Sequence, residues 1–270
     1  MIEPAAALSP ARVLVAMDTG TLNQPALSAA AGVAAALGAR LEGLFVENAD
    51  LVRLGGLPFA SEISAVTGAW RDLAVDEIER ALRLQAARIE RLLADAAKRV
   101  RVPWSFETAR GRLVAQAIAR EAELTILGGA NRAAETASLL AVSRRAHPGR
   151  RSMAVLFDAS PTSLRALEVA GRLADALGSD LRLLMPSGAP AQSAAIRDRA
   201  QAWLATEGRA GLALPLDAGE GALATALLKA RSELLVHGVS DLTQSLQTLA
   251  VLVEQVSCPL LIVRVAHSVV

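Results

Sequence analysis

The sequence has little of several residue types, and each shortage excludes a class of protein. Its 270 residues include a single cysteine, Cys258, so no disulfide can form within the chain and a reducing compartment is expected. Tyrosine is absent and aromatic residues make up 3%, which argues against the stacking platforms of single-strand nucleic-acid binders. The net charge is +1, without the positive excess that a nucleic-acid partner calls for.

Long apolar runs are also missing. Charged residues interrupt every stretch before it reaches the ~18 residues of a membrane-spanning helix. The first ten residues show neither the basic start nor the apolar run of a signal peptide. We therefore expect a cytoplasmic protein without a membrane partner. Hydrophobic residues make up 53% of the chain, enough for a large core, and the length suits two domains.

The chain repeats itself. Residues 12–18 read RVLVAMD, and residues 152–158, which lie 140 positions later, read SMAVLFD. A second match joins residues 111–128, GRLVAQAIAREAELTILG, to residues 221–238, GALATALLKARSELLVHG, at a displacement of 110. The first repeat therefore holds about thirty residues that the second lacks.

Short apolar runs alternate with helical patterns throughout both repeats. Residues 13–17 are a continuous apolar run, typical of a strand buried on both faces, and residues 25–37 predict a helix. Residues 72–100 predict a long amphipathic helix. The alternation predicts an α/β fold with helices on both faces of a parallel sheet, once in residues 1–147 and once in residues 148–270. Ligands of such folds bind beyond the carboxyl ends of the strands, where the strand order reverses.

The first repeat lacks a counterpart of the last strand. Residues 260–265 predict a closing strand in the second repeat, whereas the first repeat runs through Pro148 and Gly149 into the opening strand of the second. The open edge of a fourth strand invites association. We expect this edge to be paired across the halves or in a dimer, or to be covered by a helix.

Two segments of the second repeat resemble the universal stress protein family. They are residues 158–170, DASPTSLRALEVA, and residues 258–264, CPLLIVR. The first repeat opens in the same way, so the resemblance is to a tandem pair. It implies two flavodoxin-like domains of the adenine nucleotide alpha hydrolase-like kind, with strand order 3-2-1-4-5. It also implies a non-enzymatic role in stress response, ATP binding in some members, and dimers that often pair through the final strand.

The resemblance places a nucleotide site after the fourth strand, where binding members carry Gly-x2-Gly-x9-Gly followed by Ser or Thr. Glycines there let backbone N–H groups approach phosphates. Only the first glycine is kept, as Gly128 in one repeat and Gly238 in the other. Asn131 and Asp241 take the second position, and a carboxylate at Asp241 would repel a phosphate. The ATP site is therefore predicted to be degraded in both repeats, with ATP retained as a candidate ligand for the first repeat only.

The loop after the first strand of each repeat, with Asp18 or Asp158, lies against the adenine base in binding relatives. The interpretation that we favour is that these carboxylates cap the turn into the next helix, as Ser160-Pro161 also indicates. Together with the glycine segments and the end of the second strand, these loops make up the candidate ligand-binding set: Asp18, Thr19, Gly20, Val46, Gly128, Gly129, Asn131, Arg132, Asp158, Ser160 and Gly238.

The extra residues of the first repeat form an insert at residues 48–70. It leaves from the carboxyl edge of the sheet, and it carries apolar residues that need cover. We expect it to close over the crevice of the first repeat and to occlude or reshape it. The alternatives are a lid over an apolar ligand and a surface for a partner.

No motif indicates catalysis or a metal site. The three histidines are far apart, and there is no Gly-x-Ser-x-Gly elbow, phosphate loop or dinucleotide motif. His237 alone ends a strand beside a crevice. We predict a regulatory protein without catalytic activity that binds a small molecule or a partner, as a homodimer or with another protein. One alternative is an ATP-binding protein that uses the first crevice, with slow hydrolysis left open. The other is a pure interaction scaffold with filled crevices.

Overall fold

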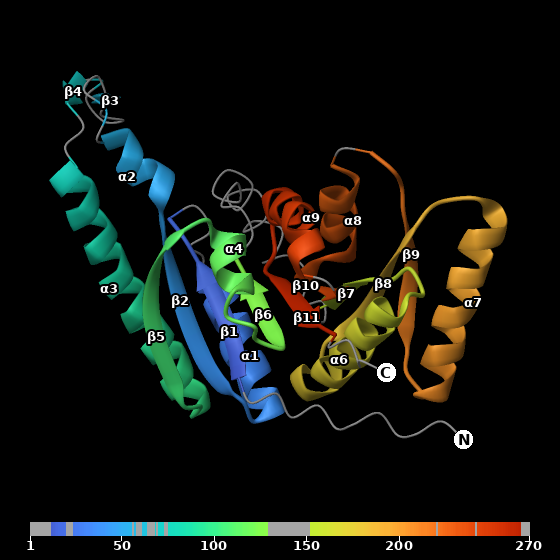
Figure 1. Ribbon diagram of the computed structural model, residues 1–270. Helices are drawn as coiled ribbons and strands as arrows, with labels where there is room; N and C mark the ends of the chain where they lie inside the picture. The colour runs from blue at the N-terminus through green and yellow to red at the C-terminus, as the bar shows by residue number, and fades with distance from the viewer. Residues whose placement is uncertain are drawn as a thin grey trace.

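The computed structural model describes residues 12–19, 24–55, 57, 61–63, 68, 70–72, 75–128, 152–219, 221–240 and 242–265. Nine strands form one sheet in the order β5-β2-β1-β6-β11-β10-β7-β8-β9 (Figure 1). The first half of the chain contributes β1 (Arg12–Met17), β2 (Arg40–Asn48), β5 (Trp104–Gly111) and β6 (Leu124–Leu127). The second half contributes β7 (Ser152–Leu156), β8 (Asp180–Pro186), β9 (Gly211–Leu216), β10 (Ser232–Val239) and β11 (Leu260–Arg264).

Helices cover both faces of the sheet. One face carries α1 (Gln24–Leu37), α3 (Val75–Val100), α6 (Pro161–Leu177) and α7 (Pro190–Thr206). The other face carries α4 (Leu113–Ile118), α8 (Ala222–Ala230) and α9 (Leu242–Gln255). Each face has one apolar cluster, and both clusters draw buried residues from both halves of the chain. The predicted α/β class is confirmed, and the two repeats share their core.

One antiparallel pair of strands joins the repeats. Every other pairing in the sheet is parallel, whereas β11 runs antiparallel to β6, with Leu260 opposite Leu127 and Val263 opposite Leu124. The edge of β6 is thus paired across the halves, which was one of the expected outcomes. The second half has the expected order 3-2-1-4-5, and β11 also stands fifth beside the first half. The proposed boundary between residues 147 and 148 lies outside the described residues.

Because β11 pairs with β10 on one side and β6 on the other, neither of its edges is open. A dimer of the kind that the family resemblance implies, through the final strand, cannot form without breaking one of these pairings. The outer strands of the nine-stranded sheet are β5 and β9. Any dimer made by extending this sheet must therefore use β5 or β9.

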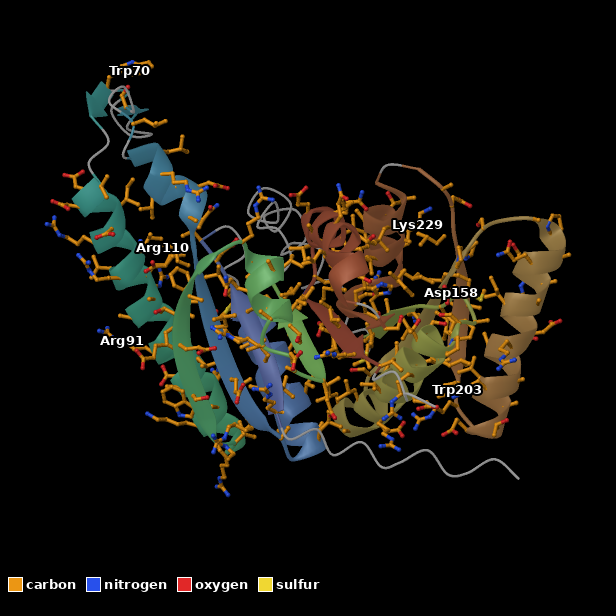
Figure 2. The ribbon with its side chains drawn as sticks, in the orientation of Figure 1. Trp70, Arg91, Arg110, Asp158, Trp203 and Lys229 are labelled. Carbon is orange, nitrogen blue, oxygen red and sulfur yellow. The ribbon has the colours of Figure 1, made fainter. Side chains whose placement is uncertain are left out.

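The insert forms α2 (Ala49–Gly55) and an antiparallel pair of short strands, β3 (Ser61–Ile63) and β4 (Trp70–Asp72). Helix α2 contacts α3 and the edge strand β5. Trp70, labelled at the tip of the insert in Figure 2, is 71% exposed. Much of the loop around the first crevice lies outside the described residues, so occlusion of that crevice by the insert stays a prediction.

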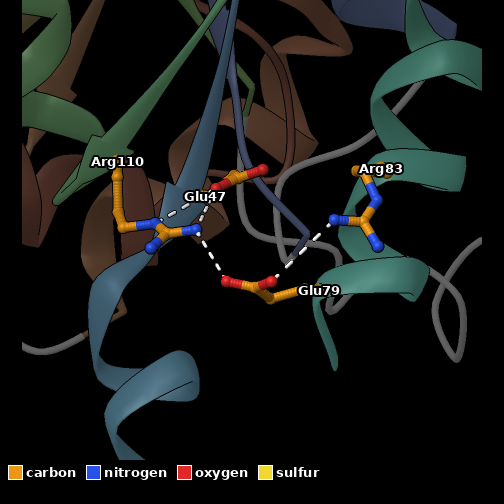
Figure 3. A network of polar contacts seen from close by, with 4 residues as sticks. All are labelled: Glu47, Glu79, Arg83 and Arg110. Carbon is orange, nitrogen blue, oxygen red and sulfur yellow. Dashed lines mark hydrogen bonds and ion pairs between the residues drawn. The ribbon is translucent and has the colours of Figure 1, made fainter. Parts of the chain in front are cut away.

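A network of charged side chains fixes the two ends of the insert (Figure 3). Arg110, near the end of β5, donates from Nε and Nη2 to Glu47 Oε2 at 3.2 and 3.1 Å. The same Nη2 lies 3.4 Å from Glu79 Oε1, and Arg83 approaches Glu79 Oε2 at 3.8 Å. The hydrogen bond and the charge of Glu47 raise the pKa of Arg110. Glu47 precedes α2 and Glu79 lies near the start of α3, so Arg110 ties together the points where the insert leaves and returns.

Candidate functional site

A cavity of about 150 Å³ lies at the carboxyl ends of the strands in the second half. It sits between β7 and β10, where the strand order reverses, and α6 and α9, the helices that follow these two strands, lie on opposite faces. This is where ligands bind in doubly wound α/β folds. Its apolar lining includes Phe157, which follows β7, and four residues of β7, β8 and β9: Leu156, Leu184, Pro186 and Leu216.

The polar side of the cavity begins in the turn between β7 and α6. Asp158 Oδ1 accepts hydrogen bonds from Ser160 N at 3.0 Å and from Ser160 Oγ at 2.5 Å. Ser160 is the N-cap of α6, because its Oγ accepts from Ser163 N at 3.2 Å, and Pro161 follows as the first helical residue. The helix start at Ser160-Pro161 is as predicted. Asp158 caps the turn at Ser160 and not the helix itself. Ala159 between them has φ of 65°, the left-handed region that a residue with Cβ rarely adopts.

Asp158 and His237 are the titratable residues that line the cavity. Partial burial alone would raise the pKa of Asp158, but hydrogen bonds from Ser160 and Ser163 outweigh it and the pKa lies below its ordinary value. Burial lowers the pKa of the half-buried His237, and the negative charge of Asp158 only partly opposes this. At neutral pH the wall therefore presents a carboxylate beside a neutral imidazole.

Asp158 and His237 can both form further hydrogen bonds with a ligand. Both hydrogen bonds that Ser160 donates to the Asp158 carboxylate go to Oδ1. A carboxylate oxygen has two lone pairs, so Oδ2 can still accept a hydrogen bond from a ligand. The His237 ring makes no hydrogen bond to any described residue. Figure 2 labels Asp158 at the carboxyl edge of the sheet, and this side chain is exposed. The cavity therefore offers an acceptor at its mouth and an imidazole on its wall.

Gly238 is needed for packing at the same place. A Cβ built on Gly238 would lie 2.0 Å from the carbonyl oxygen of Thr162 in the first turn of α6. The backbone of β10 thus touches the backbone of α6, and the absence of a side chain makes this contact sterically feasible. The sequence places Gly238 in the candidate ligand-binding set, as the one glycine of the family's nucleotide pattern that the second repeat keeps. Its close approach to Thr162 gives it a structural reason that does not involve a ligand.

The structure brings some of the predicted ligand residues together. Asp158, Ser160 and Gly238 line the cavity. In the first half, Asp18 and Thr19 follow β1, Gly128 follows β6, and Val46 is fully buried in β2. Complete burial argues against contact between Val46 and a ligand. The remaining members of the set lie outside the described residues: Gly20, Gly129, Asn131 and Arg132.

The cavity also includes residues that the predicted set did not contain. The sequence predicts that His237 ends a strand beside a crevice, although the candidate set does not include it. Pro186 lies 140 positions after Val46, so the first displacement of the repeat could have pointed to it. Leu184 and Leu216 left no signal in the sequence, because which side of a strand faces a cavity depends on neighbouring strands. Thr162 left none either, because its place on the wall depends on how α6 packs against β10.

The arrangement does not form a nucleophilic centre. Ser160 and His237 line the cavity with Asp158. In a catalytic triad, however, the imidazole is hydrogen-bonded to the hydroxyl and the carboxylate is hydrogen-bonded to the imidazole. Here the Ser160 hydroxyl donates a hydrogen bond directly to Asp158, and His237 is hydrogen-bonded to neither residue. Burial raises the pKa of the Cys258 thiol to about 12, so it is not an activated nucleophile.

The described residues contain no group of three or more His, Cys, Asp or Glu side chains placed to hold a metal ion. Within those residues, no helix is both long and apolar enough to cross a membrane.

A mostly parallel sheet with helices on both faces and a cavity at the switch point defines a flavodoxin-like α/β protein. No protein-family model and no curated protein matches the chain. Among solved structures, it is similar to a universal stress protein from Archaeoglobus fulgidus DSM 4304. The TM-score is 0.55 and the identity 13%, over 93% of this chain and 96% of that one. The chain therefore has a fold like that of universal stress proteins.

Two other solved structures match a smaller share of the chain. A universal stress protein in complex with cAMP is 25% identical, with a TM-score of 0.34, over 43% of this chain and 98% of that one. A member of the universal stress protein family from Burkholderia pseudomallei is 24% identical, with a TM-score of 0.33, over the same shares.

Proposed function

We propose that this chain is a regulatory protein of the stress-response type, without catalytic activity, and that it acts by binding a small molecule in the cavity between β7 and β10. One observation carries the proposal: a cavity at the switch point has two polar groups on its wall that can bond a ligand, the Asp158 carboxylate, whose Oδ2 receives neither hydrogen bond from Ser160, and the His237 ring, which no described residue hydrogen-bonds. A half-buried polar group such as the His237 ring normally finds a partner, and a ligand would supply it here.

The size of the cavity limits the ligand. Its volume of about 150 Å³ is smaller than the ~300–1,000 Å³ of typical ligand pockets. An apolar cavity of about 150 Å³ engineered in another protein holds one benzene molecule. The part of the ligand that enters should therefore be about the size of a single ring or a nucleobase.

A triphosphate does not suit this cavity. With His237 neutral, Asp158 is the one charged group among the described residues that line the cavity, and its charge is negative. The glycine that could have let the backbone approach phosphates is packed against Thr162 instead. ATP binding in the first half, through Gly128, Gly129, Asn131 and Arg132, is a separate proposal that the same titration can address.

The test is calorimetric titration of the full chain with adenine and, separately, with Mg-ATP. Leu216→Trp would fill the cavity, whereas Leu212→Trp on the same strand is a matched control, because Leu212 is 48% exposed and does not line the cavity. We expect adenine to bind the wild type and Leu212→Trp, and not Leu216→Trp. Unchanged adenine affinity in Leu216→Trp, or no binding to the wild type, would contradict the proposal. Saturable Mg-ATP binding that survives Leu216→Trp would support the first-half alternative.

A further inference from the structure

We infer that the cavity between β7 and β10 selects cationic ring ligands over neutral ones, and neutral over anionic ones, and that Asp158 sets this preference. The inference rests on the proposed function, since it names the chemical class of ligand for the same cavity. It starts from the carboxylate, which is held in a defined orientation.

Three features hold Asp158 in place. Its Oδ1 accepts two hydrogen bonds from Ser160, whose own Oγ is tied to the first turn of α6. The intervening Ala159 adopts the left-handed region, which fixes the turn in a tight shape. The side chain is thus already ordered before a ligand arrives, so little conformational entropy is lost on binding. Oδ2 is left to accept a hydrogen bond from a ligand.

The rest of the wall suits a flat ring with a donor group at one edge. Leu156, Leu184, Pro186 and Leu216 provide apolar cover for the ring faces. His237, neutral because burial lowers its pKa, offers one N–H donor and one lone pair and so adds no charge of its own. A ring that carries an amidinium or amino group would place its N–H donor at Asp158 Oδ2 and keep its apolar body against the four apolar residues.

The size of the preference follows from the exposure of Asp158. Hydrogen bonds to charged groups are stronger than neutral ones, but an exposed carboxylate is screened by solvent. We therefore expect a cationic ring to bind about two- to fivefold more tightly than its neutral analogue. An anionic analogue places two like charges together and should bind more weakly still. High salt should shrink the difference, since the Debye length falls to ~3 Å at 1 M.

Benzamidine, benzamide and benzoate form a matched series for the test, because they share one ring and carry charges of +1, 0 and −1 at neutral pH. Titration of the full-length protein should show affinity that falls in this order, and Leu216→Trp should abolish all three. Asp158→Asn removes the charge, and its amide oxygen can still accept from Ser160. In this variant benzamidine and benzamide should bind alike, with benzamide near its wild-type affinity. Asp198→Asn, at an exposed position on α7, is the control that should keep the order.

Each outcome decides between the two proposals. If benzamide binds but benzoate binds as tightly as benzamidine, the charge preference is wrong and ring binding in the cavity stands. If Asp158→Asn keeps the full preference while benzamide binding is intact, another group sets it and the inference is overturned. If none of the three probes and no adenine binds the wild type, the proposed function itself fails, and the inference with it.

Discussion

Gly238→Ala tests the tightest contact between the sheet and a helix. A Cβ at this position would lie 2.0 Å from the carbonyl oxygen of Thr162 and 2.6 Å from its carbonyl carbon, and both are backbone atoms. Real Cβ contacts essentially never fall below 3.0 Å, so β10 and α6 must move apart by at least about 1 Å. Overpacking costs ~1–3 kcal/mol and occasionally more. Because no flexible side chain can yield here, we expect a loss of about 3 kcal/mol in the free energy of unfolding.

Urea unfolding followed by circular dichroism measures this loss, with Gly32→Ala as the matched control. Gly32 lies within α1, and the one described atom within 4 Å of a Cβ there, outside α1 itself, would be Leu177 Cδ2, at an ordinary 3.6 Å. Alanine is more stable than glycine inside a helix by ~0.5–1 kcal/mol, so the control should gain stability. The same chemical change should therefore move the unfolding midpoint in opposite directions at the two sites. A Gly238→Ala protein within about 0.5 kcal/mol of the wild type would refute the reasoning, since surface substitutions commonly fall in that range.

Three further substitutions have expected outcomes. Ser160→Ala removes the N-cap of α6 and should lower the free energy of unfolding by ~1 kcal/mol in the same urea assay; an unchanged midpoint would contradict the capping role. Cys258→Ala should abolish a decrease in the free energy of unfolding that the wild type shows at alkaline pH. Burial raises the pKa of this thiol from 9.0 to about 12, so its stabilising effect is fully present below pH 9 and is lost as the pH rises from 9 towards 12, by ~1.4 kcal/mol per pH unit. If the free energy of unfolding of the variant falls over that pH range as that of the wild type does, ionisation of the thiol does not cause the decrease. Arg110→Ala releases Glu47 and Glu79, and hydrogen exchange should become faster in α2 while that of α6 stays the same; equal exchange in α2 would show that the network does not hold the insert.

Much of the fold could be predicted because buried strands and helices leave periodic signals in the sequence. The apolar run at residues 13–17 became β1, and the amphipathic pattern at 72–100 became α3, except that Asp72 ends β4. The Ser160-Pro161 start of α6 was equally readable, because capping is a local interaction between neighbouring residues. Strand order followed from the family resemblance, and the structure has it in the second half.

The site was harder to predict because it depends on contacts between residues distant in the chain. Whether His237 has a hydrogen-bond partner is decided by what lies opposite it on β7 and α6, and no sequence pattern records this. The glycine pattern indicated a phosphate role for Gly238, whereas its contact with Thr162 became visible only when β10 and α6 were placed together. Likewise, the open edge of β6 had three candidate partners, and the pairing with β11 is decided by packing between the repeats.

The double pairing of β11 has a consequence for synthesis of the chain. Strand β6 is complete at residue 127, but the strand that covers its edge ends at residue 264, 137 residues later. At translation rates of ~5–20 residues per second, the first repeat waits about 7 to 27 seconds with an uncovered edge. During that interval β6 can pair with a neighbouring nascent chain, which is the hazard of any exposed strand edge. A ribosome stalled before residue 260 would carry a chain that lacks β11. Two strands, β6 and β10, would then each have an open edge, because β11 pairs with both of them.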